Sequence, residues 1–239
     1  MNKNKINWVF DIDGTLTPSR LRIDPSFESF FLKWMEGKQV YLVTGSDAPK
    51  TREQVGDEIW KRATRVFQSC GNQIYENGEI QYENPWKPSQ ELNDYLKHLL
   101  QLSECPEKTS NHIEARVGLV NFSPVGRDCT QEQRIRYNEW DNGTQERLIY
   151  AKLIEKEFPD LEASVGGQIS IDIHPKGANK SQVRDMLEGP IWFFGDKTGP
   201  GGNDKPLADA LVEGDRVFPV NDPQHTQQLL QELDESNQI

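Results

Sequence analysis

The chain of 239 residues has few cysteines, a deficit of positive charge and no long apolar segment. Its three cysteines, Cys70, Cys105 and Cys129, have neither the number nor the spacing of a disulfide framework or a zinc site, so we expect reduced thiols in a cytoplasmic protein. The 27 lysines and arginines against 38 aspartates and glutamates give a formal net charge of −11, which disfavours binding to nucleic acid or to an anionic membrane surface. No apolar run is long enough to span a bilayer and no signal peptide is recognised, so we expect no membrane association.

Short apolar runs that alternate with helical patterns predict a parallel sheet built from two separate parts of the chain. The first part has apolar runs at 8–10, 40–43 and 65–68, helical patterns at 27–34 and 49–62, and a hairpin pattern with an Asn-Gly turn at 74–86. The second part continues the alternation at 179–188, 190–195, 204–212, 216–220 and 223–235.

Between these two parts, the predicted helices and strands follow a different order. A helix at 89–102, strands over 112–122, a helix at 145–158 and a strand at 167–174 predict an α+β unit with an antiparallel sheet. A chain of this length accommodates two modest domains, each with its own core. The predicted fold class is therefore α/β, with a doubly wound parallel-sheet core at 1–81 and 178–239 and an inserted α+β domain at 82–177.

The segment Asp11-Ile-Asp-Gly-Thr-Leu-Thr-Pro-Ser-Arg20 directly follows the first apolar run. Asp11 and Asp13 leave the carboxyl end of a predicted strand, which is the edge of an open α/β sheet where ligands bind. Two close carboxylates repel each other and one pKa rises, unless a cation such as Mg²⁺, which prefers oxygen ligands, joins them. The simplest chemistry for the pair is phosphoryl transfer, with one aspartate as nucleophile and the other as acid/base. The competing interpretation is a surface turn, which Asp and Gly also favour.

Later segments favour phosphoryl transfer over a surface turn. One predicted strand ends at Thr44, whose hydroxyl and following backbone amides suit a phosphate. Lys180 lies just ahead of a helical pattern, and another strand ends at Asp196, ahead of Asn203 and Asp204. An aspartate pair, a hydroxyl, a lysine and a late Gly-Asp pair, in this order, resemble the four motifs of the haloacid dehalogenase (HAD) superfamily.

The predicted insertion carries side chains suited to a phosphate group. Arg116 lies on a predicted strand, Arg127 just past its end, and Arg134 shortly afterwards. Guanidinium groups bind phosphate oxygens with two parallel hydrogen bonds and always stay charged. In a later strand with alternating character, Ser170 and Asp172 share the face opposite the isoleucines. Each arginine, taken singly, is equally well explained as an ordinary surface residue.

A closer resemblance runs over nearly the whole chain. It is carried by Asp11-Ile-Asp-Gly-Thr-Leu-Thr-Pro-Ser-Arg20, Asn121-Phe-Ser-Pro-Val-Gly-Arg-Asp-Cys-Thr-Gln-Glu-Gln-Arg134, Gly166-Gly-Gln-Ile-Ser-Ile-Asp172 and Phe193-Phe-Gly-Asp-Lys-Thr-Gly-Pro-Gly-Gly-Asn-Asp204. These strings resemble the eukaryotic-type phosphomannomutases, a branch of the HAD superfamily. The resemblance implies a phosphosugar mutase that interconverts hexose 6-phosphate and hexose 1-phosphate, with mannose as the favoured sugar. The reaction would pass through an aspartyl-phosphate, and a hexose 1,6-bisphosphate would be intermediate and activator.

The same resemblance implies a role for each matching position. Asp11 corresponds to the nucleophile and Asp13 to the acid/base, while Lys180 and Thr44 would hold the transferring group. The implied substrate-binding set is Arg20, Arg116, Arg127, Arg134, Ser170 and Asp172. The implied Mg²⁺ site consists of Asp11, the backbone carbonyl of Asp13 and Asp196, with Asn203 and Asp204 in support.

The chain also departs from the family pattern. Gly177-Ala-Asn179 precedes the lysine where the family has an aromatic residue and an acid, and after Asp204 the match weakens. His112 and Ala115 stand where the family has aromatic residues that help to form a homodimer through the inserted domain. The sequence therefore leaves this homodimer open.

Two other functions compete with the mutase. A Mg²⁺-dependent sugar-phosphate phosphatase would use the same aspartates and lysine, but a monophosphate substrate needs only one phosphate site, whereas the arginines offer a second. A non-catalytic sugar-phosphate sensor would gain nothing from keeping both Asp11 and Asp13. The sequence does not separate mannose from glucose, which differ in the orientation of one hydroxyl.

Overall fold

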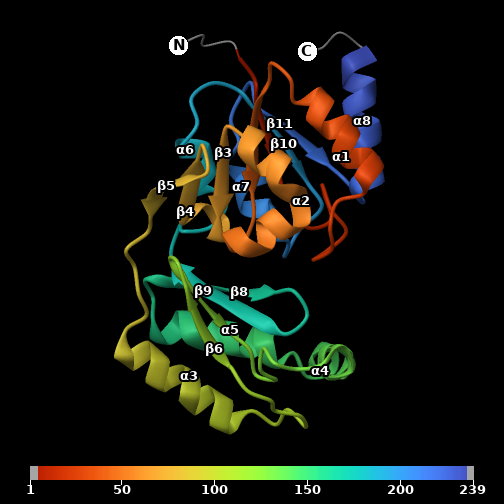
Figure 1. The fold of residues 1–239 in the computed structure, drawn as a ribbon. Coiled ribbons are helices and arrows are strands. Elements are labelled where there is room, and N and C mark those ends of the chain that lie inside the picture. Colours follow the sequence, from red (N-terminus) through yellow and green to blue (C-terminus); the bar gives the residue numbers. More distant parts are fainter. Residues whose placement is uncertain (1–4, 236–239) are drawn as a thin grey trace. The chain divides into compact units, whose positions relative to one another are not determined.

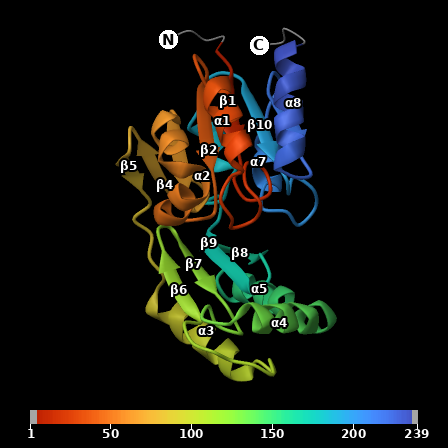
Figure 2. The ribbon, with the colours of Figure 1, turned by 45° about the vertical axis from the view of Figure 1, so that its right-hand side comes forward.

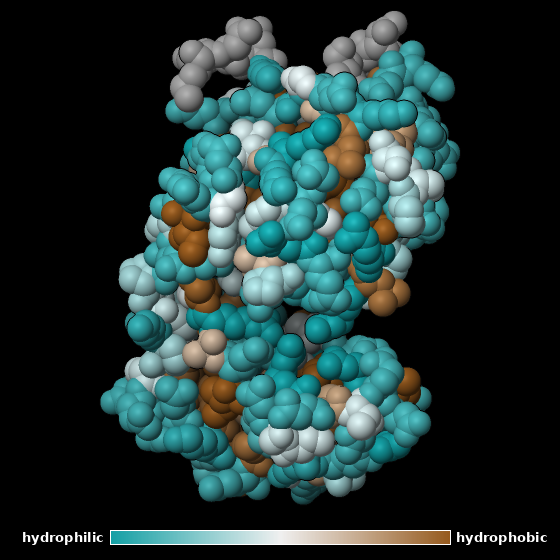
Figure 3. All heavy atoms as spheres, viewed as in Figure 1, coloured by the Kyte–Doolittle hydropathy of each residue, from teal (hydrophilic) through white to brown (hydrophobic). Residues whose placement is uncertain are grey.

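The computed structural model describes residues 5–235 and divides the chain into two compact units. The first comprises the chain up to Glu83 and from Asn179 onward, and the second comprises Asn84–Ala178. Figures 1 and 2 show each unit built around its own sheet. Over residues 5–235, no helix combines the length and apolar character that crossing a membrane requires. Hydrophilic side chains predominate on the face drawn in Figure 3, where apolar ones form small separate patches.

The first unit contains a seven-stranded sheet in the order β11-β10-β1-β2-β3-β4-β5. The first five of these strands are parallel, and β4 and β5 add an antiparallel hairpin at one edge. The strands are β1 (Asn7–Phe10), β2 (Gln39–Val43), β3 (Arg65–Gln68), β4 (Gln73–Glu76), β5 (Glu79–Glu83), β10 (Ile191–Gly195) and β11 (Arg216–Pro219). The helices are α1 (Pro25–Trp34), α2 (Ala48–Arg62), α6 (Gln182–Asp185), α7 (Lys205–Ala210) and α8 (Pro223–Glu235), with a 3₁₀ turn at Ser69–Gly71.

Helices cover both faces of this sheet. Successive side chains of a strand point to opposite faces, so Trp8 and Phe10 of β1 pack in the cluster formed with α1, α2 and α8, whereas Val9 packs in the cluster formed with α6 and α7. Phe10 stacks on Phe194 of the neighbouring β10 with ring centroids 4.7 Å apart. The predicted α/β fold with a doubly wound sheet is confirmed.

Local sequence signals explain where several elements begin and turn. The carboxylate of Asp24 accepts hydrogen bonds from the backbone N–H groups of Ser26 and Phe27 and caps α1, which starts with a proline. Asn77 and Gly78 connect β4 to β5 with φ values of 54° and 79°, the left-handed conformations that a two-residue hairpin turn requires.

The second unit contains a four-stranded antiparallel sheet in the order β6-β7-β9-β8. Helices α3 and α5 pack on one of its faces, against Val120 and Phe122 of β7 and Ile171 and Ile173 of β9. The opposite face carries the polar residues of the same strands. The elements are α3 (Gln90–Leu102), β6 (Ile113–Arg116), β7 (Leu119–Phe122), α4 (Gln131–Thr144), α5 (Glu146–Glu157), β8 (Leu161–Gly166) and β9 (Ser170–Pro175).

The structure adds elements that the sequence patterns did not predict. Helix α4 was not expected because it is polar almost throughout and buries only Tyr137 and Asp141. Strand β8 was not expected either, because its second half is partly exposed. The helical pattern at 179–188 forms only the single turn of α6.

Candidate active site

Three of the predicted site residues directly follow neighbouring parallel strands. Asp11 follows β1, Thr44 follows β2 and Asp196 follows β10. Strand β1 pairs with β2 on one side and with β10 on the other, so the three carboxyl ends meet at the same edge of the sheet. Asp11 and Thr44 are each only 2% exposed. Thr44 Oγ1 accepts a hydrogen bond of 3.0 Å from the backbone N–H of Ser46, which fixes its position at this edge.

Lys180 joins two carboxylates in the interior of the first unit. Its Nζ donates to Asp11 Oδ1 at 2.5 Å and to Asp204 Oδ1 at 2.7 Å. Lys180 and Asp204 are fully buried. The second oxygen of Asp204 accepts from the backbone N–H of Lys197 at 3.0 Å. The lysine therefore holds Asp11 in place and offers a positive charge next to it.

The electrostatics of this cluster are strongly coupled. Burial and the neighbouring charge of Asp204 raise the pKa of Asp11 to about 8, against the opposing effect of Lys180. Burial alone would lower the pKa of Lys180, but the charges of Asp11 and Asp204 raise it above its ordinary value. Burial also raises the pKa of Asp196. The cluster thus holds more negative than positive charge, and an additional cation would favour the ionised form of Asp11.

The residues present fit a divalent cation. Carboxylate oxygens of Asp11, Asp196 and Asp204 lie within 4.8 Å of one another. Asp11 Oδ2 and Asp196 Oδ1 are buried and find no hydrogen-bond partner among residues 5–235. Both oxygens of Asp204 already accept hydrogen bonds, so Asp11 and Asp196 offer the available ligand atoms. Buried carboxylate oxygens without partners are costly unless a ligand satisfies them.

Gly14 lets the loop after β1 approach this cluster closely. A Cβ atom at this position would lie 2.3 Å from Asp196 Oδ2, and φ is +87°. Both the contact and the left-handed backbone exclude an ordinary side chain. The glycine that follows the two aspartates in the motif is therefore required by geometry.

The carboxylate of Asp13 faces other partners than Asp11. Its Oδ1 accepts hydrogen bonds from Gln54 Nε2 at 2.8 Å and from the backbone N–H of Arg20 at 2.5 Å. The carboxylates that raise the pKa of Asp11 are those of Asp204 and Asp196. The sequence analysis expected repulsion between Asp11 and Asp13, but Asp13 is not what raises the pKa of Asp11.

Gln54 is a residue that sequence reasoning missed. It is 1% exposed on α2, and its amide also donates to Thr17 Oγ1 at 3.0 Å. Gln54 is one of several polar residues in its helix, and no sequence pattern distinguishes it as the one that contacts Asp13. Arg20 contributes its backbone N–H to Asp13, and its side chain is exposed. Asn203 is likewise exposed, next to the buried Asp204.

The polar face of the second unit brings several other predicted residues together. Glu114 Oε2 accepts from Arg116 Nη2 at 2.6 Å and lies 3.4 Å from Arg127 Nε. Arg127 Nη1 donates to Ser170 Oγ at 3.1 Å. Two guanidinium groups therefore share one carboxylate, with a serine hydroxyl beside them, and the positive charge that remains in excess suits an anion.

Asp172 and Arg134 lie in different environments within this unit. Asp172 is opposite Asn121 in the sheet and accepts a hydrogen bond of 2.6 Å from Asn121 Nδ2. Arg134 is in the first turns of α4, and its side chain makes no hydrogen bond or ion pair with any residue in the described part of the chain. No sequence motif pointed to Arg147, which is buried and paired with Asp141.

Comparisons with known proteins agree with this architecture. The sequence model of a family described as eukaryotic phosphomannomutase matches residues 27–236. Phosphomannomutase 1 of Mus musculus is 37% identical over 97% of this chain and 93% of its own length, and the Homo sapiens protein of the same name is 36% identical over the same shares. A haloacid dehalogenase-like hydrolase from Bacteroides thetaiotaomicron shares the fold at 15% identity, with a TM-score of 0.61 over 97% of this chain and 100% of that chain. The chain therefore belongs to the eukaryotic phosphomannomutase family.

Proposed function

We propose that the protein is a phosphosugar mutase that interconverts hexose 6-phosphate and hexose 1-phosphate, with mannose as the favoured sugar. The observation that carries this proposal is the cluster of the buried Asp11, Lys180 and Asp204 with the half-buried Asp196, in a chain of this family. The names of the relatives support the mutase over the phosphatase, and support mannose over glucose.

The proposed chemistry begins at Asp11. Its carboxylate attacks the phosphorus of a phosphosugar, the bond from phosphorus to the sugar oxygen breaks, and an aspartyl-phosphate forms. Asp13 donates a proton to the departing sugar oxygen and later removes a proton from the hydroxyl that takes the phosphoryl group back. Gln54 and the Arg20 N–H hold the carboxylate of Asp13 by two hydrogen bonds, which supports its role in moving a proton at a fixed place.

Lys180 and Thr44 would hold the transferring group. Phosphoryl transfer depends mainly on positioning and on the neutralisation of charge. A bound Mg²⁺ would supply further positive charge at the phosphoryl oxygens, held by Asp11, the backbone carbonyl of Asp13 and Asp196, with Asn203 and Asp204 in support. The buried oxygens of Asp11 and Asp196 that lack partners favour this assignment.

The second unit would bind the phosphate that does not react. Arg116, Arg127 and Arg134 provide positive charge, and Ser170 and Asp172 provide hydrogen bonds to phosphate and sugar. We assign Arg20, in the first unit, to the same substrate-binding set. A hexose 1,6-bisphosphate, which we propose as intermediate and activator, has two phosphates and needs a site for each. In this proposal residues 82–177 are a substrate-binding domain and the rest of the chain is the catalytic core.

A cytoplasmic location and a homodimer through the inserted domain are also part of the proposal. The reduced state expected for the cysteines supports the first, and the full-length similarity to the family supports the second. His112 and Ala115 stand in place of the family's aromatic residues, so these two positions would not supply aromatic contacts to such a dimer. Sedimentation of the purified protein over a range of concentrations would determine whether it forms.

The experiment that tests the proposed function changes Arg127 and compares substrates. Loss of one charge-assisted bidentate contact costs about 1.5–3 kcal/mol, roughly 10- to 150-fold in kcat/KM. Arg127→Ala should show this loss with hexose phosphates but hardly with acetyl phosphate or p-nitrophenyl phosphate, whose single phosphate is the reacting one and which have no second end for Arg127 to hold. Arg127→Lys should recover only part of the loss, because an ammonium group does not replace the planar fork. An equal loss on all substrates would mean that Arg127 only supports the fold.

A further inference from the structure

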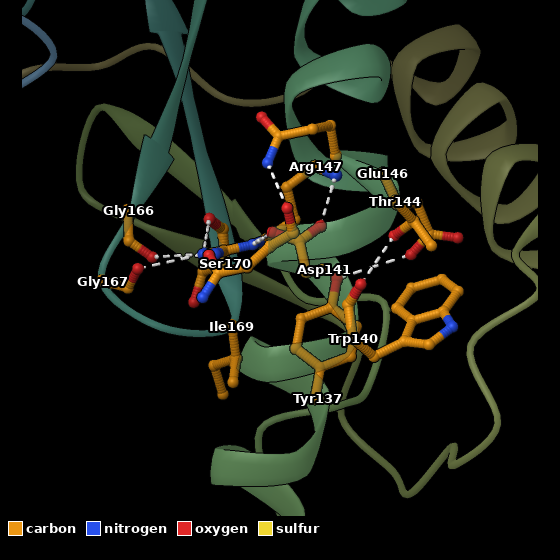
Figure 4. Close-up of polar contacts among 12 residues, drawn as sticks. Tyr137, Trp140, Asp141, Thr144, Glu146, Arg147, Gly166, Gly167, Ile169 and Ser170 are labelled. Atoms are coloured by element: carbon orange, nitrogen blue, oxygen red, sulfur yellow. Dashed lines mark hydrogen bonds and ion pairs between the residues drawn. The ribbon is translucent and has the colours of Figure 1, made fainter.

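Arg147, at the start of α5, is a buried cation in the second unit that lies outside the proposed phosphate-binding set. It is 3% exposed, and its partner Asp141, on α4, is 5% exposed. The backbone N–H and Nε of Arg147 donate to the two carboxylate oxygens of Asp141 at 2.9 and 2.8 Å. The guanidinium carbon also lies 5.9 Å from the centre of the Tyr137 ring. This pair fixes the direction in which the guanidinium points (Figure 4).

The opposite side of the guanidinium points to the turn between β8 and β9. Arg147 Nη1 donates to the carbonyl oxygen of Gly167 at 3.0 Å, with longer contacts to the carbonyls of Gly166 at 3.4 Å and Ser170 at 3.5 Å. Figure 4 shows these carbonyls converging on the one side chain. Gly167 has a φ of +52°, so the turn follows a path that most residues would not adopt. One arginine thus connects the junction of α4 and α5 to the whole turn.

The turn leads directly to a residue of the proposed phosphate site. Ser170 begins β9, and its hydroxyl accepts the hydrogen bond from Arg127 Nη1. Ser170 is 3% exposed, so its backbone has little room to shift. A displacement of the turn would move the hydroxyl and with it the preferred orientation of the Arg127 guanidinium. Groups that bind a ligand are held in position by such outer contacts.

We propose that Arg147 is a positioning residue for phosphosugar binding: it locks the β8–β9 turn so that Ser170 and Arg127 are preorganised for the phosphate that does not react. The inference rests on the proposed function, in which Ser170 and Arg127 bind that phosphate. A lysine at this position has a single ammonium nitrogen in place of the three nitrogens of the guanidinium group. Its side chain can therefore donate either to Asp141 or to the carbonyls of the turn, but not to both.

Arg147→Lys tests this role because KM and kcat for hexose phosphates should respond differently to the substitution. KM for hexose phosphates should rise about 10-fold, in line with the loss of outer contacts at other preorganised sites, while kcat changes much less. Turnover of acetyl phosphate should stay unchanged. Asp141→Asn, which keeps the size of the partner but removes its charge, should move KM in the same direction by a smaller factor. The matched control is Ile154→Val, a core residue of the same helix, which should lower the melting temperature without raising KM.

A second readout separates the failure of this inference from the failure of the proposed function. In Arg147→Lys, the backbone amides of residues 166–170 should exchange with deuterium faster than in the wild type, while those of α3 should not. Unchanged exchange in the turn would overturn the inference, and so would faster exchange with an unchanged KM. If Arg127→Ala leaves KM for hexose phosphates unaltered, the proposed phosphate site is wrong, and the exchange experiment still decides whether Arg147 locks the turn.

Discussion

Replacing Lys180 by methionine removes the only positive charge in direct contact with two of the buried carboxylates, among the residues that the structure describes. Methionine nearly preserves the length and apolar stem of the side chain, so the change is mainly one of charge. Asp11 and Asp204 would lose contacts of 2.5 and 2.7 Å in a region with almost no exposure to water. Removal of one partner of a buried ion pair costs about 3–5 kcal/mol. This is a large part of the roughly 5–15 kcal/mol by which a domain is stable.

The loss should depend on pH with a definite sign. Without Lys180, the folded-state pKa of Asp11 rises even further above its value in the unfolded chain, because the group that lowers it is gone. A carboxylate whose folded pKa is raised destabilises the fold above the unfolded pKa, and this effect disappears as the pH falls and the group is protonated. Relative to the wild type, the destabilisation of Lys180→Met should therefore be smaller at pH 5 and grow as the pH rises through about 8, where Asp11 of the folded wild type ionises.

Urea unfolding followed by tryptophan fluorescence, in the presence of EDTA, measures this loss. The matched control is Lys205→Met, because Lys205 makes a half-exposed pair with Asp209 on α7. Such a pair contributes about 0.3–0.5 kcal/mol. If Lys180→Met lost no more stability than this control, or lost more at pH 5 than at pH 8, the electrostatic account of the cluster would be wrong.

Three further predictions concern the proposed chemistry. Asp11→Asn should still bind hexose phosphate in calorimetry but lose turnover, because the amide is not a nucleophile; wild-type turnover would exclude Asp11 from that role. Asp13→Asn should still form a phosphorylated protein with acetyl phosphate, which needs no proton to release its leaving group, but should not isomerise a hexose phosphate. EDTA should abolish activity, and Mg²⁺ should restore it better than Ca²⁺, whose coordination is larger and looser; full activity in EDTA would remove the metal from the mechanism.

The elements that position the first unit's site could be predicted from the sequence because each has a local signal. Short apolar runs followed by polar residues marked the carboxyl ends of β1, β2 and β10, and parallel pairing then places Asp11, Thr44 and Asp196 together. Lys180 lies 169 residues from Asp11, so only its motif, and not its contact, was visible in the sequence.

The contacts that hold the site residues could not be predicted in the same way. Gln54 reaches Asp13 across 41 residues, and Arg147 reaches Gly167 across 20. Such pairs depend on the tertiary fold and leave no periodic pattern. Helix α4 escaped prediction for a related reason, since it buries too few apolar side chains to show an amphipathic pattern.

The most direct test of the proposed mutase measures which product forms, the isomeric hexose phosphate or free phosphate. The protein would be incubated with mannose 1-phosphate, glucose 1-phosphate and the corresponding 6-phosphates, with Mg²⁺, and with and without a hexose 1,6-bisphosphate. The isomeric hexose phosphate and free phosphate would be measured in the same samples. The account predicts that isomer is the main product, that its formation depends on the bisphosphate, and that mannose phosphates are favoured. Free phosphate as the main product, with little isomer at any bisphosphate concentration, would contradict it and identify a phosphatase.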